Sequence, residues 1–300
     1  MLYVYWLASL VLLTVIAVYV HKRQTYTIVS RSLQLQKDAE RQTLELQSYQ
    51  TELISSIQYA KEIQDALLPG SEYVLRHLPL SFIYYNPKEL VGGDFFWFHK
   101  VDNDTFILIC ADCTGHGIPG ALMTMLGNSF LNQIILEDQI YELPKILHAL
   151  DEKVRMTLRQ TQPGCIQDGM DISIIKINKR TRELYFAGAR HRIVLFKQNM
   201  CHELRGNKFS IGGYSHNKNF TETKYLVDEE DTIYMFSDGY VDQFGGPDDK
   251  KFSTKRFYEM LTIMQSMTMN DQRKFIVKTI DDWKYGYEQT DDITVIGVKF

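Results

Sequence analysis

The sequence is poor in the residues that would replace an ordinary hydrophobic core. Its 300 residues include only four cysteines, which excludes a disulfide-stapled scaffold. Seven prolines and 18 glycines exclude a collagen-like or proline-rich chain. The sequence also has no excess of positive charge, because its net charge is −4, so we expect no nucleic-acid binding. What is present is 45% hydrophobic and 12% aromatic residues, enough for one or two globular domains.

The first residues form an uninterrupted apolar run. Leu2–Val20 holds no charged residue, and a helix of this length spans about 28 Å, close to the ~30 Å hydrocarbon core of a bilayer. Lys22 and Arg23 follow the run, and basic residues favour the cytoplasmic side. Residues 1–23 are therefore predicted to be a single-pass transmembrane helix with a basic flank. The alternative is a buried core helix.

Residues 24–69 have a different texture. They contain no glycine or proline before Pro69, and Pro69-Gly70 is a strong stop signal for a helix. Apolar side chains recur every three or four residues, at Leu46, Tyr49, Leu53, Ile57, Ala60, Ile63 and Leu67. This spacing predicts a helical coiled-coil linker that could join two copies of the chain. A helix packing on its own downstream domain has the same pattern, and the two interpretations are compatible.

Residues 70–300 read as one domain without a linker or repeat. Short runs rich in β-branched and aromatic residues predict strands at 81–85, 105–111, 172–177, 183–187, 192–196, 221–227, 232–236 and 293–300. Longer stretches of helical period predict helices at about 119–136, 143–161, 254–264 and 271–284. Strands and helices do not alternate regularly, so the pattern favours an α+β fold over a doubly wound parallel sheet.

Aspartates stand beside several of these predicted strands. Asp94 follows two glycines, and Asp112 directly follows the predicted strand 105–111. Asp238 comes shortly after the predicted strand 232–236, and Asp291 and Asp292 directly precede the predicted strand 293–300. Each one alone is explained by a turn or a cap. Together they indicate a site for a hard cation, Mn²⁺ or Mg²⁺, provided that the fold brings them together.

At these residues the sequence resembles the SpoIIE/RsbU-type branch of the PPM metal-dependent serine/threonine phosphatases. The resemblance covers about residues 55–300. The motifs that carry it are Val91-Gly92-Gly93-Asp94-Phe95-Phe96-Trp97, Ala111-Asp112-Cys113-Thr114-Gly115-His116-Gly117, Asp168-Gly169-Met170-Asp171, Phe186-Ala187-Gly188-Ala189-Arg190, Phe236-Ser237-Asp238-Gly239 and Thr290-Asp291-Asp292-Ile293-Thr294.

The resemblance implies two antiparallel sheets sandwiched between helical layers, with two Mn²⁺ or Mg²⁺ ions at the sheet edge. The implied metal ligands are the carboxylates of Asp94, Asp112, Asp238 and Asp291 and the backbone carbonyl of Cys113. Asp112, as the bridging ligand, and Asp94 are the implied catalytic residues. Asp292 is the alternative to Asp291, because sequence cannot separate the pair.

The expected function is that of a membrane-anchored serine/threonine phosphatase in a bacterial inner membrane, with its catalytic domain in the cytoplasm. In this branch the usual substrate is a phosphorylated regulatory protein, often a STAS domain, and a metal-activated water attacks the phosphoryl group. We expect the linker helix to gate activity and to form a homodimer. The alternatives are a catalytically inactive, membrane-tethered scaffold and a two-metal hydrolase of small phosphate esters.

Two features depart from the eukaryotic members of the family. A histidine two residues after the bridging aspartate is often proposed there as a general acid, whereas His116 lies four residues after Asp112. No arginine matches their phosphate-binding residue, although Arg190 and Arg192 lie in a matching motif. The chain also has one Cys-x-x-Cys, at 110–113, which is a weak zinc signal, and the first cysteine is expected in the core.

Overall fold

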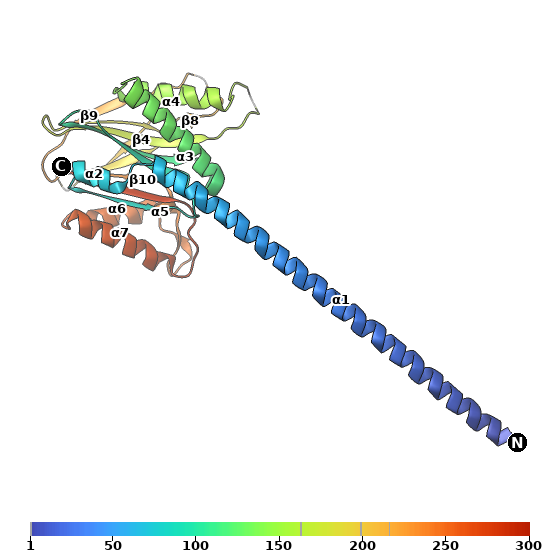
Figure 1. The fold of residues 1–300 in the computed structure, drawn as a ribbon. Coiled ribbons are helices and arrows are strands. Elements are labelled where there is room, and N and C mark those ends of the chain that lie inside the picture. The colour runs from blue at the N-terminus through green and yellow to red at the C-terminus, as the bar shows by residue number, and fades with distance from the viewer. Residues whose placement is uncertain (1, 163, 199, 216) are drawn as a thin grey trace. The chain divides into compact units, whose positions relative to one another are not determined.

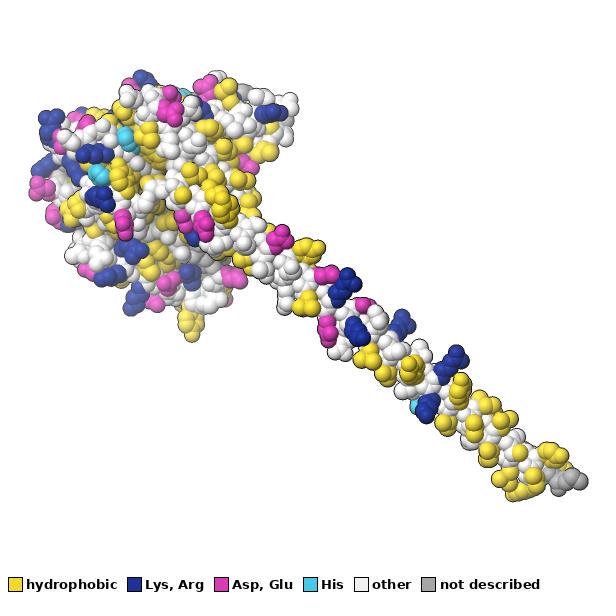
Figure 2. Space-filling model, viewed as in Figure 1, with side chains coloured by type: hydrophobic (Ala, Val, Ile, Leu, Met, Phe, Trp, Pro, Cys, Tyr) yellow, Lys and Arg dark blue, Asp and Glu magenta, His cyan; other side chains and the backbone are white. Residues whose placement is uncertain are grey.

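Helix α1 (Leu2–Leu67) opens the chain in this computed structural model, which describes residues 2–162, 164–198, 200–215 and 217–300. The chain divides into two compact units, Met1–Ser56 and Ile57–Phe300. In the first unit, an 18-residue window near the N-terminus has a mean hydropathy of 2.1 and none of it is buried. By length and composition this segment could cross a membrane, and Figure 2 shows hydrophobic side chains covering it before the first basic ones.

The second unit begins with the last turns of α1, which stop just before Pro69 as predicted. A short helix, α2 (Ser71–His77), follows and was not predicted. Gln64 is the buried residue of α1. The last turns of α1 are thus part of the globular unit, because a buried polar side chain needs partners there.

Two antiparallel sheets form the centre of the second unit. The first has the order β1 (Ser81–Asn86), β13 (Ile293–Lys299), β10 (Thr232–Phe236), β6 (Arg192–Lys197) and β7 (Met200–Arg205). The second has the order β2 (Asp94–Lys100), β3 (Thr105–Cys113), β4 (Gly169–Asn178), β5 (Glu183–Ala189) and β9 (Glu222–Leu226), with β8 (Ile211–Gly212) beside β4. A small hairpin pairs β11 (Phe244–Gly245) with β12 (Lys250–Lys251).

Helices cover the outer face of each sheet (Figure 1). The helices α3 (Gly117–Leu131) and α4 (Leu143–Thr157), with the π-helical turn η1 (Asn132–Glu137), pack on the six-stranded sheet. The helices α5 (Gly239–Asp242), α6 (Thr254–Met264) and α7 (Met269–Lys284) pack on the five-stranded sheet. A third core joins the inner faces of the two sheets. The α+β sandwich expected from the sequence is confirmed.

Most predicted strands and helices are present within a few residues. The strands β2 and β7 were missed for opposite reasons. Residues 94–98 of β2 are all buried, so they show no polar alternation, whereas the first three residues of β7, Met200, Cys201 and His202, are all exposed and show no alternation either. The helix predicted to reach residue 161 ends at Thr157.

Candidate active site

Strand register places three aspartates side by side in the six-stranded sheet. Asp94 of β2 pairs with Asp112 of β3, which in turn pairs with Asp171 of β4. Residues directly opposite each other on antiparallel strands project from the same face. Alternate residues of these strands, such as Phe96 and Leu108, lie in the core between the two sheets, so the aspartate row faces the other sheet. Asp171 was not predicted as a site residue, although it lies in one of the matching motifs.

The remaining aspartates come from the facing sheet. Asp238 lies two residues after β10, and Asp291 and Asp292 directly precede β13. Because β10 and β13 are antiparallel neighbours, the end of one and the start of the other lie at the same edge. The Thr294 hydroxyl of β13 donates to Oδ2 of Asp94 at 2.8 Å, which joins this edge to the aspartate row. The structure therefore brings the predicted acidic residues together.

The carboxylates of the site act on one another electrostatically. Burial raises the pKa of Asp94 and of Asp112 well above the usual range, and the negative charges of neighbouring aspartates add to the shift. Burial likewise raises the pKa of Asp238, and the negative charges of Asp242, Asp291 and Asp171 raise it further. Such a cluster is costly to ionise without positive charge beside it.

Asp291 and Asp292 have different surroundings. Both carboxylate oxygens of Asp292 accept backbone N–H groups, Oδ1 from Lys88 at 2.7 Å and Oδ2 from Gly93 at 2.6 Å, and the residue is 3% exposed. Among the described residues, Asp291 accepts through Oδ1 alone, from the backbone N–H of Asp292 at 2.8 Å. Asp292 therefore anchors the Gly92–Gly93 segment, and Asp291 keeps an oxygen for a ligand.

The Gly92–Gly93 segment leads into Asp94 and is held from several sides. Gln64 of α1 donates to the Gly92 carbonyl at 2.8 Å and accepts from the Gly92 N–H at 3.3 Å. The Thr124 hydroxyl of α3 lies within hydrogen-bond distance of both glycine carbonyls, at 3.2 and 3.0 Å. A Cβ on Gly93 would collide with the carbonyl of Gly115, so only glycine allows this close approach. Gln64 was missed because its sequence position is ordinary for a helix.

The two cysteines of the Cys-x-x-Cys lie on opposite faces of β3. Cys110 is in the core between the sheets, as expected, whereas Cys113 packs toward α3 and α4. A strand cannot turn both thiols to one ion, because residues three apart project to opposite sides. Burial raises the pKa of the Cys113 thiol well above its usual range, so the thiol stays protonated. Only its backbone carbonyl is suited to a metal.

The acidic cluster opens into a cavity of about 500 Å³. Its lining combines acidic and basic side chains, and comprises Asp112, Asp171, Asp238, Arg190, His191, Arg192, Arg205, Gly206, Asn207, Lys208 and Phe236. His116 is not among these residues. Its Nδ1 lies 2.7 Å from Glu89 Oε1 in an exposed loop, which fits a loop-ordering role.

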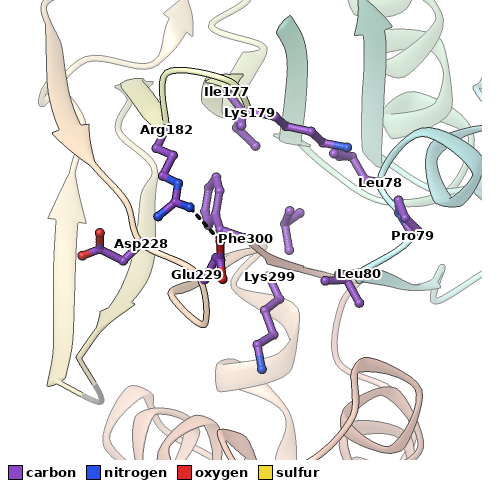
Figure 3. A pocket seen from close by; sticks show the side chains of 11 residues that line it. Leu78, Pro79, Leu80, Ile177, Lys179, Arg182, Asp228, Glu229, Lys299 and Phe300 are labelled. Atoms are coloured by element: carbon purple, nitrogen blue, oxygen red, sulfur yellow. Dashed lines mark hydrogen bonds and ion pairs between the residues drawn. The ribbon is translucent and has the colours of Figure 1, made fainter. Parts of the chain in front are cut away.

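A second cavity, of about 280 Å³, contains none of the aspartates of the site (Figure 3). It is lined largely by apolar side chains, with Phe300 and Leu80 among them. Arg182 at its rim pairs with Glu229 at 2.7 Å. A phosphoryl group is suited to the first cavity rather than this one, because the two carboxylates of the second, Asp228 and Glu229, are paired with Lys197 and Arg182.

The donor chemistry of the acidic cluster fits hard divalent cations. Carboxylate and carbonyl oxygens are the ligands that Mg²⁺ and Mn²⁺ prefer, and cations would neutralise the crowded negative charge. Within the part of the chain that the structure describes, no three Asp, Glu, His or Cys side chains are already arranged as a complete ligand set. Side-chain adjustment would therefore accompany binding.

The fold is that of a PP2C/PPM-type phosphatase. Residues 102–300 match the family model described as Stage II sporulation protein E (SpoIIE), so the chain belongs to this family. It is 21% identical over 215 residues to phosphoserine phosphatase RsbP of Bacillus subtilis, covering 70% of this chain but only 49% of that protein, about half its length.

Two solved structures show the same architecture. The SiaA-PP2C domain of Pseudomonas aeruginosa has a TM-score of 0.76 and 29% sequence identity, covering 84% of this chain and 98% of that one. The PP2C phosphatase domain of SpoIIE from Bacillus subtilis, with a fragment of its regulatory domain, has a TM-score of 0.57 and 16% identity, covering 73% and 61%. The second likeness concerns the fold alone.

Proposed function

We propose that this protein is a membrane-anchored serine/threonine protein phosphatase that hydrolyses phosphoserine or phosphothreonine on a regulatory protein. The observation that carries the proposal is the meeting of strand-end aspartates from both sheets at one cavity. RsbP, the relative from Bacillus subtilis, is by its name a phosphoserine phosphatase. A phosphorylated STAS-domain protein is the substrate class that the family resemblance implies.

Two Mn²⁺ or Mg²⁺ ions are the proposed cofactors. We assign Asp94, Asp112, Asp238 and Asp291, with the Cys113 carbonyl, to hold them, since both oxygens of Asp292 already accept backbone N–H groups. When bound, such ions acidify a water molecule and screen the charge of the phosphoryl group. The magnesium complex of RsbX, similar in fold with a TM-score of 0.50, is consistent with this choice.

The protein's own residues orient these carboxylates. Thr294 donates to Asp94, and the Ser210 hydroxyl donates to Oδ1 of Asp171 at 2.5 Å. These hydrogen bonds fix the side chains on rigid strands, which is what a precise site requires. Asp292 acts through Gly93, so it positions Asp94 rather than contacting substrate.

Phosphatase activity is tested on the full chain in nanodiscs with Mn²⁺. We expect turnover of phosphoserine proteins and peptides, and its loss in Asp112→Ala and in Asp238→Ala. The control, Asp138→Ala, changes an exposed aspartate outside the cavity and should keep the activity. Hydrolysis of small esters alone would favour a small-molecule hydrolase, and binding of phosphoproteins without any turnover would favour a scaffold.

The anchor is proposed to be the apolar N-terminal part of α1, with the remainder in the cytoplasm of a bacterium. Its side chains are exposed in the single chain, which a lipid environment would relieve. Membrane fractionation tests it directly. The intact chain should resist extraction by high salt and alkaline carbonate, whereas replacing Leu10 and Leu13 by lysine should release it to the soluble fraction.

The linker is proposed to dimerise. Leu46, Tyr49 and Leu53 are 63%, 71% and 58% exposed in the single chain, which is unusual for an apolar seam at heptad spacing. A second copy of the helix would cover them. Crosslinking through a cysteine introduced at Leu53 should trap a dimer, and one introduced at Glu52 on the neighbouring face should do so less.

Gating by the helix is proposed to act through Gln64. This side chain is 3% exposed and bonds both polar groups of Gly92, two residues before Asp94. Rotation or withdrawal of the last turns of α1 would therefore shift the segment that positions Asp94. Gln64→Ala should change phosphatase activity several-fold, whereas Gln58→Ala, an exposed glutamine of the same helix, should not. Equal activities of the two variants would refute this coupling.

A further inference from the structure

Four basic residues line the cavity beside the acidic cluster, namely Arg190, Arg192, Arg205 and Lys208, which we call the basic wall. Phosphoryl chemistry alone does not explain them. At about 500 Å³ the cavity is of the size that small-molecule ligands occupy, which is more than a phosphoryl group needs. The cavity therefore has room for parts of a substrate beyond its phosphate.

The basic wall comes from two segments, residues 190–192 and 205–208, that are joined by their backbones. Arg190 donates its N–H to the Asn207 carbonyl at 2.7 Å, and Asn207 donates to the Gly188 carbonyl at 2.8 Å. A Cβ on Gly206 would collide with Gly188, so the close approach of the loops depends on glycine. Arg190 itself has a φ of 52°, a left-handed conformation that few residues other than glycine adopt. The structure thus holds this arginine in place at some conformational cost.

The four cations differ in how far they are already engaged. Arg192 lies over the Phe236 ring, 5.9 Å from its centroid, and donates to Thr254 at 3.1 Å. Arg205 is paired with Glu203. These two side chains are committed to contacts within the domain.

Arg190 and Lys208 are engaged less closely. The Arg190 side chain is 68% exposed and forms an ion pair with Asp171, in which Nε lies 3.8 Å from Oδ2, longer than a hydrogen bond. Lys208 is exposed, and among the residues that the structure describes it has no ion-pair partner. Asp171 lies next to Asp112 in the aspartate row, so an anion held by Arg190 would lie close to the reacting phosphate.

His191 adds no charge to this wall. It is 8% exposed, and neither ring nitrogen has a hydrogen-bond partner of good geometry, although the Phe236 carbonyl lies near. Burial lowers the pKa of His191 to about 4, so the ring is neutral at neutral pH. The positive charge that a ligand meets here comes from arginine and lysine, which stay charged throughout the physiological range.

We propose that Arg190 and Lys208 form a subsite for a carboxylate side chain close in sequence to the phosphorylated serine or threonine of the substrate. The inference rests on the proposed phosphatase function and adds a substrate class to it. The phosphate would lie at the acidic wall with its cations, and the flanking Asp or Glu of the substrate would lie at the basic wall. The two walls of the cavity then select a phosphorylated residue in an acidic local sequence.

The test compares peptides that differ only beside the phosphorylated residue. The peptides carry Asp, Ala or Lys at each of the positions within two residues of phosphoserine, and hydrolysis by the full chain in nanodiscs gives kcat/KM. A parallel series with a non-hydrolysable phosphonate serine gives Kd by fluorescence anisotropy, which needs no turnover. At one position or more, Asp should be preferred over Lys by about fivefold or more, the scale of an exposed ion pair, and added salt should reduce the preference.

Charge reversal provides the matched variants. Lys208→Glu should invert the preference so that the Lys peptide binds better than the Asp peptide. Arg190→Gln should reduce the preference for the Asp peptide without inverting it. Lys278→Glu introduces the same change at an exposed lysine of α7 outside the cavity and should keep the wild-type preference. Lys208 is exposed, so its replacement should not prevent folding.

Two outcomes overturn the subsite. One is equal Kd and kcat/KM for the Asp, Ala and Lys peptides at every position. The other is a preference for Asp that survives unchanged in Lys208→Glu and in Arg190→Gln. Failure of the proposed function has a different signature, namely no hydrolysis of any phosphopeptide or of p-nitrophenyl phosphate with Mn²⁺ or Mg²⁺.

Discussion

The buried aspartates predict an unusual dependence of stability on pH. Burial raises the pKa of Asp94, Asp112 and Asp238 in the folded protein. Above about pH 4 the unfolded chain has released protons that the folded, metal-free protein still holds. The free energy of unfolding therefore falls as the pH rises through the raised pKa values, opposite to a protein whose carboxylates are salt-bridged.

The size of the effect follows from the strand register. Asp94 and Asp112 are directly opposite on β2 and β3, and side chains so paired start about 5 Å apart. Two charges at that separation repel by about 3 kcal/mol at an effective dielectric constant near 20. Asp112→Asn removes one charge with little change of shape. It should stabilise the metal-free protein at neutral pH by on the order of 2–3 kcal/mol and abolish most stabilisation by added Mn²⁺.

Thermal unfolding of the full chain in nanodiscs, with and without a chelator, measures both effects. Trp97 is buried in the core between the six-stranded sheet and its helices and reports unfolding by its fluorescence. The control is Asp138→Asn, an exposed aspartate outside the cluster, which should leave the pH dependence and the response to Mn²⁺ unchanged. If wild type and Asp112→Asn lose stability equally with rising pH, or gain it equally from Mn²⁺, the aspartates do not share one site.

Two further pairs of variants test the linker and a buried ion pair. A two-residue insertion after Gln47 turns the following helix by about 200° and should change phosphatase activity. A seven-residue insertion keeps the heptad phase and should change the activity less. Equal effects of the two insertions would count against rotational gating. Lys218→Met breaks an ion pair with Asp151, 2.6 Å long and 4% and 8% exposed, and should cost about 3–5 kcal/mol of stability in denaturant unfolding. Lys145→Met, at an exposed pair, should cost less than about 1 kcal/mol, and similar losses in the two variants would contradict the assigned burial.

The sequence alone was sufficient for features that depend on local pattern. The apolar run, the uninterrupted helix up to Pro69 and most strands follow from periodicity and from residues that stop helices. The acidic positions at strand ends could also be found, because a lone Asp after an apolar strand is visible in the sequence. These features depend on residues that are close neighbours along the chain, so the sequence is enough to predict them.

Contacts between distant segments could not be read in this way. The pairing of Asp112 with Asp171 depends on the register of β3 against β4, which a shift of one residue would destroy. Asp291 and Asp292 are neighbours of the same type, and only the N–H groups of Lys88 and Gly93 give them different roles.

The same limit applies to the helix end and the basic wall. Gln64 resembles the many other glutamines of α1 until the fold places it against Gly92, and Arg190 meets Asn207 only through two loops that join different sheets. Sequence determined the chemistry available, because residue types and local periods are written along the chain. Tertiary structure decided which of those groups line one cavity, because their positions depend on strand register and on packing between segments about 200 residues apart.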